Sequence, residues 1–255
     1  MLKILFLGTG TSHGIPVIGC NCAVCQSPDP RNKRNRSSVL LTTDHANILI
    51  DTATELRLQA LRFNITKVDA VLYTHFHADH VFGFDDLRRF NDEGTKAIPV
   101  YGNAATIAEL RECFSYAFRK TQEGGKKPVV TTHIIGPTPT VINGLQIQPI
   151  PILHGKLEIY GYRFGKVAYI TDCSHIPSES EALLQGLELL ILGVLRYRPH
   201  PTHFNLSQAL EVIARLKPQR TFFTHICHDF DHEQVQRELP PNCYLSYDGL
   251  ELTII

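Results

Sequence analysis

His75-Phe76-His77-Ala78-Asp79-His80 directly follows the apolar run Val71-Leu72-Tyr73. Four metal-ligand side chains thus occupy six positions at the end of a predicted buried strand, where packing gives no reason for them. A loop that leaves a strand with this spacing can direct two imidazoles at one metal ion, and a carboxylate with another imidazole at a second. The apolar residues inside the motif argue against a His-rich tract that binds metal adventitiously. The motif therefore predicts a hydrolase site with two metals.

Three further ligand-type residues stand where other predicted strands end: His154, Asp172 and His225. Buried strands that emerge into loops are the usual place for an open metal site. The predicted partition gives the first metal His75, His77 and His154, and the second metal Asp79, His80 and His225, with Asp172 as the bridge. A hydroxide between the metals would be the nucleophile, because a metal lowers the pKa of bound water to near neutrality.

The composition is that of a globular domain without a charge bias. The chain has 255 residues, 43% of them apolar, and 25 Lys plus Arg balance 25 Asp plus Glu. We therefore expect a single domain over 1–255 and a small substrate, with no nucleic-acid partner. No run approaches eighteen apolar residues, and the first eight residues are too short for a signal peptide. A cytoplasmic protein without membrane contact is expected.

Extended segments rich in β-branched residues alternate with helical patterns along the whole chain. The predicted strands cover 2–7, 39–43, 48–51, 70–73, 98–101, 129–134, 145–150, 160–164, 167–171, 189–195 and 221–224, with a final hairpin at Asp248-Gly249. The predicted helices cover 55–62, 104–118, 178–184, 206–216 and 233–238, the fourth capped by Asn205 or Ser207 and ended by Pro218. This order predicts a mixed α/β sandwich. The polar stretch 120–127 is a predicted mobile loop.

Taken in this order, the hexapeptide, His154, Asp172 and His225 resemble the ligand set of the metallo-β-lactamase superfamily. The resemblance spans nearly the whole chain and implies an α/β, four-layered αββα sandwich. It does not give the substrate, because this superfamily hosts thioester, lactam, phosphodiester and redox chemistry. The bridging Asp172 favours the two-metal hydrolases over the lactamases proper, and Cys173 is interpreted as a neighbour rather than a ligand.

Cys20, Cys22 and Cys25 form a C-x-C-x-x-C cluster that is too tight for a disulfide framework. A structural zinc site needs four ligands in a closed tetrahedron, so the fourth must come from elsewhere in the chain. His228 is the predicted fourth ligand and Cys227 is the alternative. Such a site would tie the loop near 20–25 to the edge of the active site. The other interpretation is a cluster of reduced surface thiols.

Gly8-Thr9-Gly10-Thr11-Ser12, the cysteine cluster and Thr224-His225-Ile226-Cys227-His228 together resemble the PhnP-type phosphodiesterases of the carbon-phosphorus lyase pathway. The resemblance implies phosphonate metabolism and a small cyclic phosphate as substrate, such as 5-phosphoribosyl 1,2-cyclic phosphate. It also implies two catalytic divalent metals (Mn or Zn) and one structural Zn bound by His228. In that family a further His stands near the scissile phosphate, and His203 matches it. Asp79 and His203 are the expected catalytic residues.

The chemistry of the leaving group gives His203 a role. A histidine near its ordinary pKa could protonate the departing alkoxide or stabilise phosphoryl charge, and His200 competes for this role. The roles of His13 and His175 are open. The basic run Lys33, Arg34 and Arg36 is interpreted as a solvated face, with a second phosphate site as the alternative.

Two other functions compete with the phosphodiesterase. A transfer-RNA 3' endonuclease would need an extended basic arm, which the balanced charge does not supply. A binding protein for a biosynthetic intermediate, as in the branch linked to pyrroloquinoline quinone, tends to lose core ligands, whereas all seven are present in this chain. The expected partners are a small phosphodiester and a second copy of the chain in a homodimer.

Overall fold

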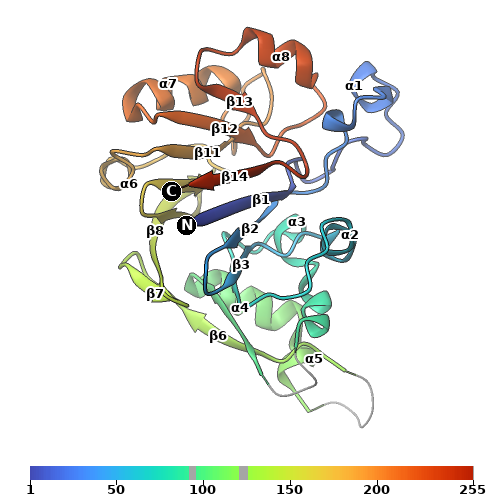
Figure 1. Cartoon of the computed structure of the whole chain (residues 1–255), viewed down its shortest axis with the longest axis vertical. Coiled ribbons are helices and arrows are strands. Elements are labelled where there is room, and N and C mark those ends of the chain that lie inside the picture. Colours follow the sequence, from blue (N-terminus) through green and yellow to red (C-terminus); the bar gives the residue numbers. More distant parts are fainter. Residues whose placement is uncertain (92–95, 121–125, 255) are drawn as a thin grey trace.

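The computed structural model describes residues 1–91, 96–120 and 126–254, which form two seven-stranded sheets packed face to face with helices on both outer faces (Figure 1). The strand order is β14-β1-β2-β3-β4-β5-β6 in the first sheet and β13-β12-β11-β10-β9-β8-β7 in the second. The predicted αββα sandwich is confirmed.

The first sheet contains β1 Leu2–Gly8, β2 Ser38–Thr42, β3 Asn47–Ile50, β4 Ala70–Leu72, β5 Ile98–Gly102, β6 Val130–Ile134 and β14 Glu251–Ile254. The second contains β7 Thr140–Ile142, β8 Leu145–His154, β9 Leu157–Phe164, β10 Val167–Ile170, β11 Leu189–Gly193, β12 Arg220–Thr224 and β13 Cys243–Leu245. The α-helices are α1 Ala23–Gln26, α2 Leu56–Arg62, α3 Ala78–Val81, α4 Ala104–Cys113, α5 Ser115–Phe118, α6 Ser178–Leu183, α7 Leu206–Leu216 and α8 His232–Glu238. Short 3-10 helices span Pro30–Asn32 (η1) and Phe84–Arg89 (η2).

Three apolar layers hold the sandwich together. The central layer lies between the sheets and contains residues such as Phe6, Tyr162 and Ile191. An outer layer under α2, η2 and α4 covers the first sheet, and another under α6, α7 and α8 covers the second. Because both faces of the inner strands are covered, β4, β10 and β11 are buried at every position instead of alternating.

Helix α7 follows the sequence pattern closely. Asn205 is its N-cap and forms a capping box with Gln208, so this cap of the two predicted is the one used. Its apolar face buries Ala209, Val212 and Leu216 against the second sheet. The predicted helix 104–118 is instead two helices, because the chain leaves the helical conformation at Phe114 between α4 and α5.

The predicted hairpin at Asp248-Gly249 is wrong. β13 pairs with β12 in the second sheet, and β14 pairs with β1 in the first. The connection therefore crosses between the sheets. The Asp248 carboxylate accepts hydrogen bonds from the Thr9 hydroxyl (2.8 Å) and from the Asn35 backbone N–H (2.7 Å), which hold the crossing in place.

Arg34 does not lie on a solvated face, contrary to the expectation from the sequence. Its side chain is only 2% exposed. The guanidinium donates to the Thr9 hydroxyl (2.8 Å), the Ser246 carbonyl (2.5 Å) and Nδ1 of His232 (3.1 Å). These partners bind the two terminal nitrogens of a charge that is costly to bury, while Nε has no hydrogen-bond partner among the described residues. They also occupy the group that the alternative assigned to a phosphate.

Two further expectations concern the periphery. Most of the predicted mobile loop at 120–127, residues 121–125, lies outside the described residues. Within the described ranges, no helix has both the length and the apolar character required to cross a bilayer.

Candidate metal centre

The candidate ligands stand at the ends of strands that finish at one edge of the sandwich. β3 and β4 are parallel, as are β10, β11 and β12. The residues that leave β3, β10 and β12 toward the site, Asp51, Asp172 and His225, have left-handed backbones with φ of 61°, 51° and 57°. This conformation is costly for residues other than glycine, and it turns each side chain sharply out of its strand.

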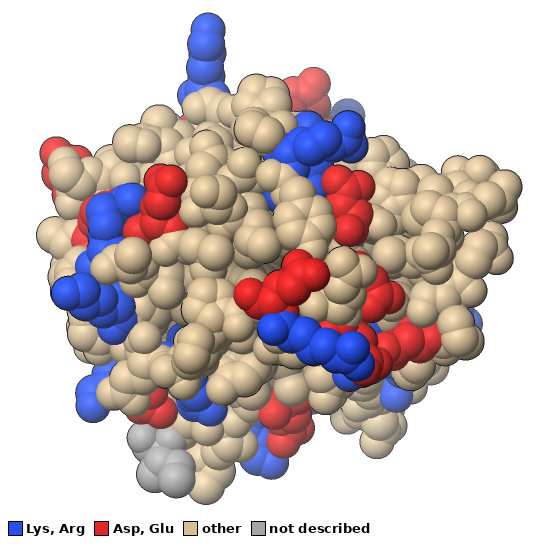
Figure 2. Space-filling model, turned by 90° about the horizontal axis from the view of Figure 1, so that it is seen from above, with Lys and Arg blue, Asp and Glu red and all other residues tan. Residues whose placement is uncertain are grey.

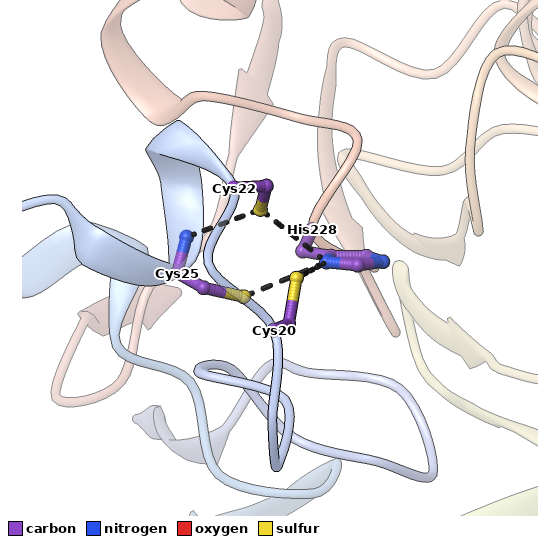
Figure 3. A group of neighbouring side chains, drawn as sticks. All are labelled: Cys20, Cys22, Cys25 and His228. Atoms are coloured by element: carbon purple, nitrogen blue, oxygen red, sulfur yellow. Dashed lines mark hydrogen bonds between the residues drawn. The ribbon is translucent and has the colours of Figure 1, made fainter.

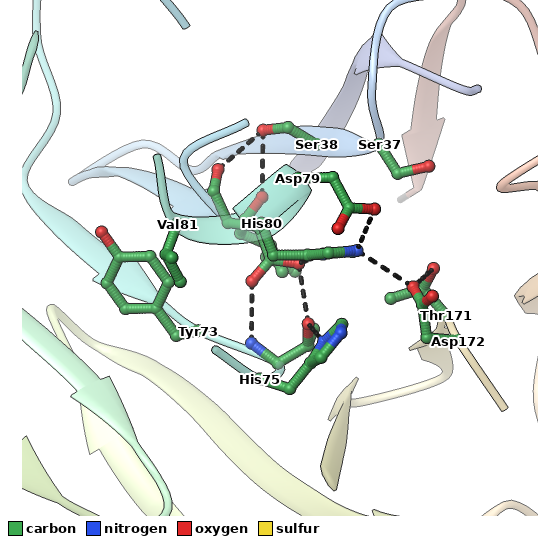
Figure 4. A network of polar contacts seen from close by, with 12 residues as sticks. Ser37, Ser38, Tyr73, His75, Asp79, His80, Val81, Thr171 and Asp172 are labelled. Carbon is green, nitrogen blue, oxygen red and sulfur yellow. Dashed lines mark hydrogen bonds and ion pairs between the residues drawn. The ribbon is translucent and has the colours of Figure 1, made fainter. Parts of the chain in front are cut away.

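The structure brings all seven predicted ligands together. Their ligand atoms form the groups His75, His77 and His154; Asp79, His80 and His225; and His75, His80 and Asp172, and His203 joins His154 and Asp172 in a further group. The Asp172 carboxylate contacts the second group directly, since its Oδ2 is 3.1 Å from Nε2 of His80 (Figure 4) and its Oδ1 is 3.1 Å from Nε2 of His225. It also lies within 4.8 Å of the ligand atoms of His75 and His154, which belong to the first group. A carboxylate in this position can bridge two metals.

The unsatisfied atoms of the site fit divalent metals. Nε2 of His75 and both ring nitrogens of His225 are buried without a hydrogen-bond partner. Burial lowers the pKa of His75 well below its usual value, so this imidazole is neutral and offers a lone pair. Burial would raise the pKa of Asp172, but His225 and His80 outweigh it and hold the pKa well below the usual range. Burial would lower the pKa of His80, but Asp79, Asp172 and Asp51 outweigh it and raise this pKa, so a metal would displace a proton from His80. Imidazoles facing ionised carboxylates form a donor set that suits zinc, manganese or iron.

Asp51 was missed by the sequence analysis. Its Oδ2 is 2.7 Å from Nδ1 of His80 and accepts a 2.8 Å hydrogen bond from the Thr74 hydroxyl, while its Oδ1 accepts from the Thr74 backbone N–H. The carboxylate therefore keeps a proton on Nδ1 of His80, so Nε2, the atom that faces Asp172, is the one left to bind a metal. The available signal was a lone carboxylate directly after the apolar strand β3, the same pattern that marked Asp172.

We expect Asp51→Asn to weaken metal binding by about 10- to 100-fold, because His80 loses the charged acceptor that fixes its ring. The measurement is metal retention against a graded series of chelator concentrations. Asp69→Asn is the matched control, since its carboxylate also accepts from a backbone N–H, that of Asn47, but lies at the far end of β4. Unchanged retention in Asp51→Asn would contradict the assigned role.

A backbone carbonyl orients His154. The Nδ1–H of His154 donates to the Thr202 carbonyl at 2.7 Å, which leaves the lone pair on Nε2. Gly155 makes this approach possible, because a Cβ at this position would lie 2.9 Å from Cγ2 of Thr202. The segment that carries His200 and His203 is therefore attached directly to a candidate ligand.

His203 lies at the centre, with Nδ1 3.5 Å from Oδ1 of Asp172 and its ring stacked 5.0 Å from that of His225. Its pKa differs from the expected ordinary value. Burial lowers this pKa to about 3, although Asp172 opposes the shift, so the ring is neutral. His203 thus offers a hydrogen bond from a neutral imidazole rather than a proton from an imidazolium. His13 and His175 are exposed and belong to none of the ligand groups among the described residues.

The cysteine cluster forms a second centre (Figure 3). Nδ1 of His228 lies 3.2, 3.4 and 3.5 Å from the Sγ atoms of Cys20, Cys22 and Cys25. In a tetrahedral zinc site, bond lengths of about 2.3 Å to sulfur and 2.0 Å to nitrogen place the two atoms about 3.5 Å apart. The four side chains therefore have the spacing of a closed Cys3His zinc site.

The neighbouring Cys227 stands apart from this cluster. Its thiol accepts a hydrogen bond from the Asp229 backbone N–H, and it belongs to none of the ligand groups of the described residues. Burial raises its pKa to about 11. In contrast, the hydrogen bond from the Cys25 backbone N–H lowers the pKa of Cys22 to about 6, which favours the thiolate that binds zinc.

The chain matches the beta-lactamase superfamily domain over residues 46–226. It belongs to the metallo-β-lactamase superfamily. The chain also resembles a crystal structure described as a new diphosphatase from the PhnP family, with 43% identity and a TM-score of 0.93 over 98% of this chain and 96% of that one. The predicted superfamily of metal-dependent hydrolases and the resemblance to PhnP are confirmed.

Other relatives are more distant or longer. An octanoyltransferase of Porphyromonas gingivalis (strain ATCC BAA-308 / W83) is 37% identical over 256 residues, covering 99% of this chain and 52% of that protein. Zn2+-bound PqqB from Methylobacterium extorquens has a TM-score of 0.81 at 18% identity, over 99% of this chain and 100% of that one, which shows the fold alone. The chain spans about half the length of several curated relatives it matches.

Proposed function

We propose that this chain hydrolyses a small phosphodiester with two divalent metals, Mn or Zn, and carries a third, structural zinc. The main support is the Asp172 carboxylate, which lies 3.1 Å from Nε2 of His80 and of His225 in one ligand group and within 4.8 Å of the ligand atoms of His75 and His154 in the other. Bound metals would stabilise charge on phosphoryl oxygens and activate a water molecule. The 43% identity with a PhnP-family diphosphatase supports a phosphorus centre as the target.

Other side chains position the ligands and the substrate. Asp51 and the Thr202 carbonyl keep a proton on Nδ1 of His80 and of His154, so Nε2 of each ring is the atom left to bind a metal. His203 faces the same carboxylate from the open side and can donate a hydrogen bond to a phosphoryl or leaving-group oxygen. Within the PhnP resemblance, a small cyclic phosphate such as 5-phosphoribosyl 1,2-cyclic phosphate is the proposed substrate.

The surface argues against a nucleic-acid substrate. Formal net charge is zero. On the face over the helices of the second sheet, Lys and Arg side chains lie among Asp and Glu, and much of the surface carries neither (Figure 2). Tight binding to a phosphate backbone needs a concentrated basic surface. We therefore propose a small substrate rather than transfer RNA.

The test supplies metal-stripped protein with Mn or Zn and measures hydrolysis of three compounds: the cyclic ribose phosphate, a bis-aryl phosphodiester and a diphosphate. Bound metals are counted in parallel. The proposal expects about three metals per chain and faster hydrolysis of the diesters than of the diphosphate. Preference for the diphosphate would move the substrate class to anhydrides, and one metal without turnover would favour a binding protein.

We expect His203→Ala to lower turnover of the bis-aryl diester by about 100- to 1,000-fold, the usual effect of removing one positioned donor to developing charge. Metal content should not change, because the predicted ligands are intact. On this simple substrate His200→Ala should do little. Equal losses in the two variants would contradict the role of His203.

A further inference from the structure

The segment from Arg196 to His203 borders the candidate metal centre on the side of His154. The Thr202 carbonyl holds His154, as described above. The Arg196 guanidinium donates back into the segment, to the carbonyls of Arg198 (3.2 Å) and Pro199 (2.9 Å). At its beginning, the Cys227 backbone N–H donates to the carbonyl of the preceding Leu195. These contacts keep the segment rigid beside the site.

His200 in this segment has a defined tautomer. The Thr202 backbone N–H donates to its Nδ1 at 3.3 Å, and the Thr202 hydroxyl lies 3.2 Å from the same atom. A backbone N–H can only donate, so Nδ1 carries the lone pair and the proton of the neutral ring is on Nε2. Burial, followed by the charge of Arg196, lowers the pKa of His200 and keeps the ring neutral. Among the residues described, Nε2 has no hydrogen-bond partner.

His200 is near enough to the centre to meet the same substrate. Its ring lies 5.0 Å from the ring of His203, which in turn lies 4.7 Å from that of His154. A compound whose reacting phosphate is at Asp172 would therefore reach His200 with its opposite end. His200 is too far from the ligand groups to belong to them, so its free N–H is available for substrate.

The charges around this segment favour an anion. Arg196 forms no ion pair within ranges 1–91, 96–120 and 126–254, and Lys156 is exposed at the turn two residues after His154. Arg198, in the same segment, forms an ion pair with Asp229 (3.8 Å), which leaves Arg196 as the unpaired positive charge of the segment among the described residues.

We propose that the segment Arg196 to His203 is a subsite for a second, non-reacting phosphate of the substrate, and that His200 is a specificity-determining residue that donates its Nε2–H to that phosphate. The proposal rests on the proposed function, whose cyclic ribose phosphate already carries a second phosphate, and adds the residue that recognises this phosphate. Arg196 contributes charge and holds the segment in position.

The test compares two ligands that differ only in the second phosphate: ribose 1,2-cyclic phosphate with and without a 5-phosphate. His200→Phe keeps the ring but removes the donor. We expect it to lower kcat/KM for the 5-phosphorylated compound by about 10- to 100-fold, mainly through KM, because a hydrogen bond to a charged group is lost. The compound without the 5-phosphate should change by less than about 3-fold. His200→Gln, whose amide can donate, should recover part of the loss.

His13→Phe is the matched control, since it replaces an exposed histidine elsewhere on the surface and should leave the ratio between the two compounds unchanged. Calorimetric Kd values of both compounds separate this inference from the proposed function. If wild-type protein hydrolyses neither compound, the function fails, and the preference in Kd still decides the subsite. An equal preference for the 5-phosphate in wild type and His200→Phe, or none in wild type, overturns the proposal.

Discussion

Asp172→Asn should reduce hydrolysis of a bis-aryl phosphodiester by more than about 1,000-fold and should release catalytic metal. The carboxylate lies 3.1 Å from His80 and His225, ligands of one proposed metal, and within 4.8 Å of the ligand atoms of His75 and His154, ligands of the other, so both proposed metals would use its charge. An amide keeps the size of the side chain but offers only one weak neutral acceptor. Loss of both metal charge stabilisation and water activation would remove most of the rate acceleration.

Asparagine is the appropriate replacement because Asp172 has φ 51°, a conformation that Asn adopts readily and Ala does not. The variant therefore separates the loss of charge from backbone strain. Asp248→Asn is a control for changing another buried carboxylate, one that accepts hydrogen bonds from Thr9 and Asn35 away from the ligand groups. The measurements are metal content, initial rate and thermal unfolding. Full metal content with wild-type rate in Asp172→Asn would remove the bridging role.

Sequence patterns were sufficient to predict the candidate ligands, because each ligand is marked by the residues directly before it in the chain. A polar ligand-type residue immediately after a buried strand, as for His154, Asp172 and His225, is unusual, and parallel strands bring such ends to one edge. Asp51 shows the same pattern but was missed, because its role depends on His80, which approaches it only in the folded chain. A residue that orients a ligand has no spacing rule of its own.

The errors of the sequence analysis share one cause. Asp248-Gly249 is a strong local turn signal, but the sheet that each flanking strand joins is decided by distant partners, β12 and β1. Arg34 lies in a local basic run, yet Ser246 and His232, about 200 positions away, bury it. The ordinary pKa assumed for His203 failed similarly, because its burial comes from packing among residues far apart in sequence. Nonlocal contacts of this kind leave no pattern within a short window.

The structural zinc site should have the largest effect on stability. We expect Cys22→Ser to lose one of about three metals and to lower Tm by more than about 10 °C, because free energy of zinc binding is also free energy of folding. The site joins the loop of α1 to His228, more than 200 residues later. Without the zinc, the buried apolar residues that pack this loop are only Ile15, Val24 and Cys25 among those described, which is too small a core to hold it in place.

The pair His228→Ala and Cys227→Ser identifies the fourth ligand. His228→Ala should match Cys22→Ser in metal content and Tm, because Nδ1 lies 3.2 to 3.5 Å from all three sulfurs. Cys227→Ser should retain the zinc, since its thiol is bound to the Asp229 N–H instead. His228 is three residues from the candidate ligand His225, so loss of zinc should also weaken the catalytic centre. Zinc loss in Cys227→Ser with retention in His228→Ala would reverse the assignment.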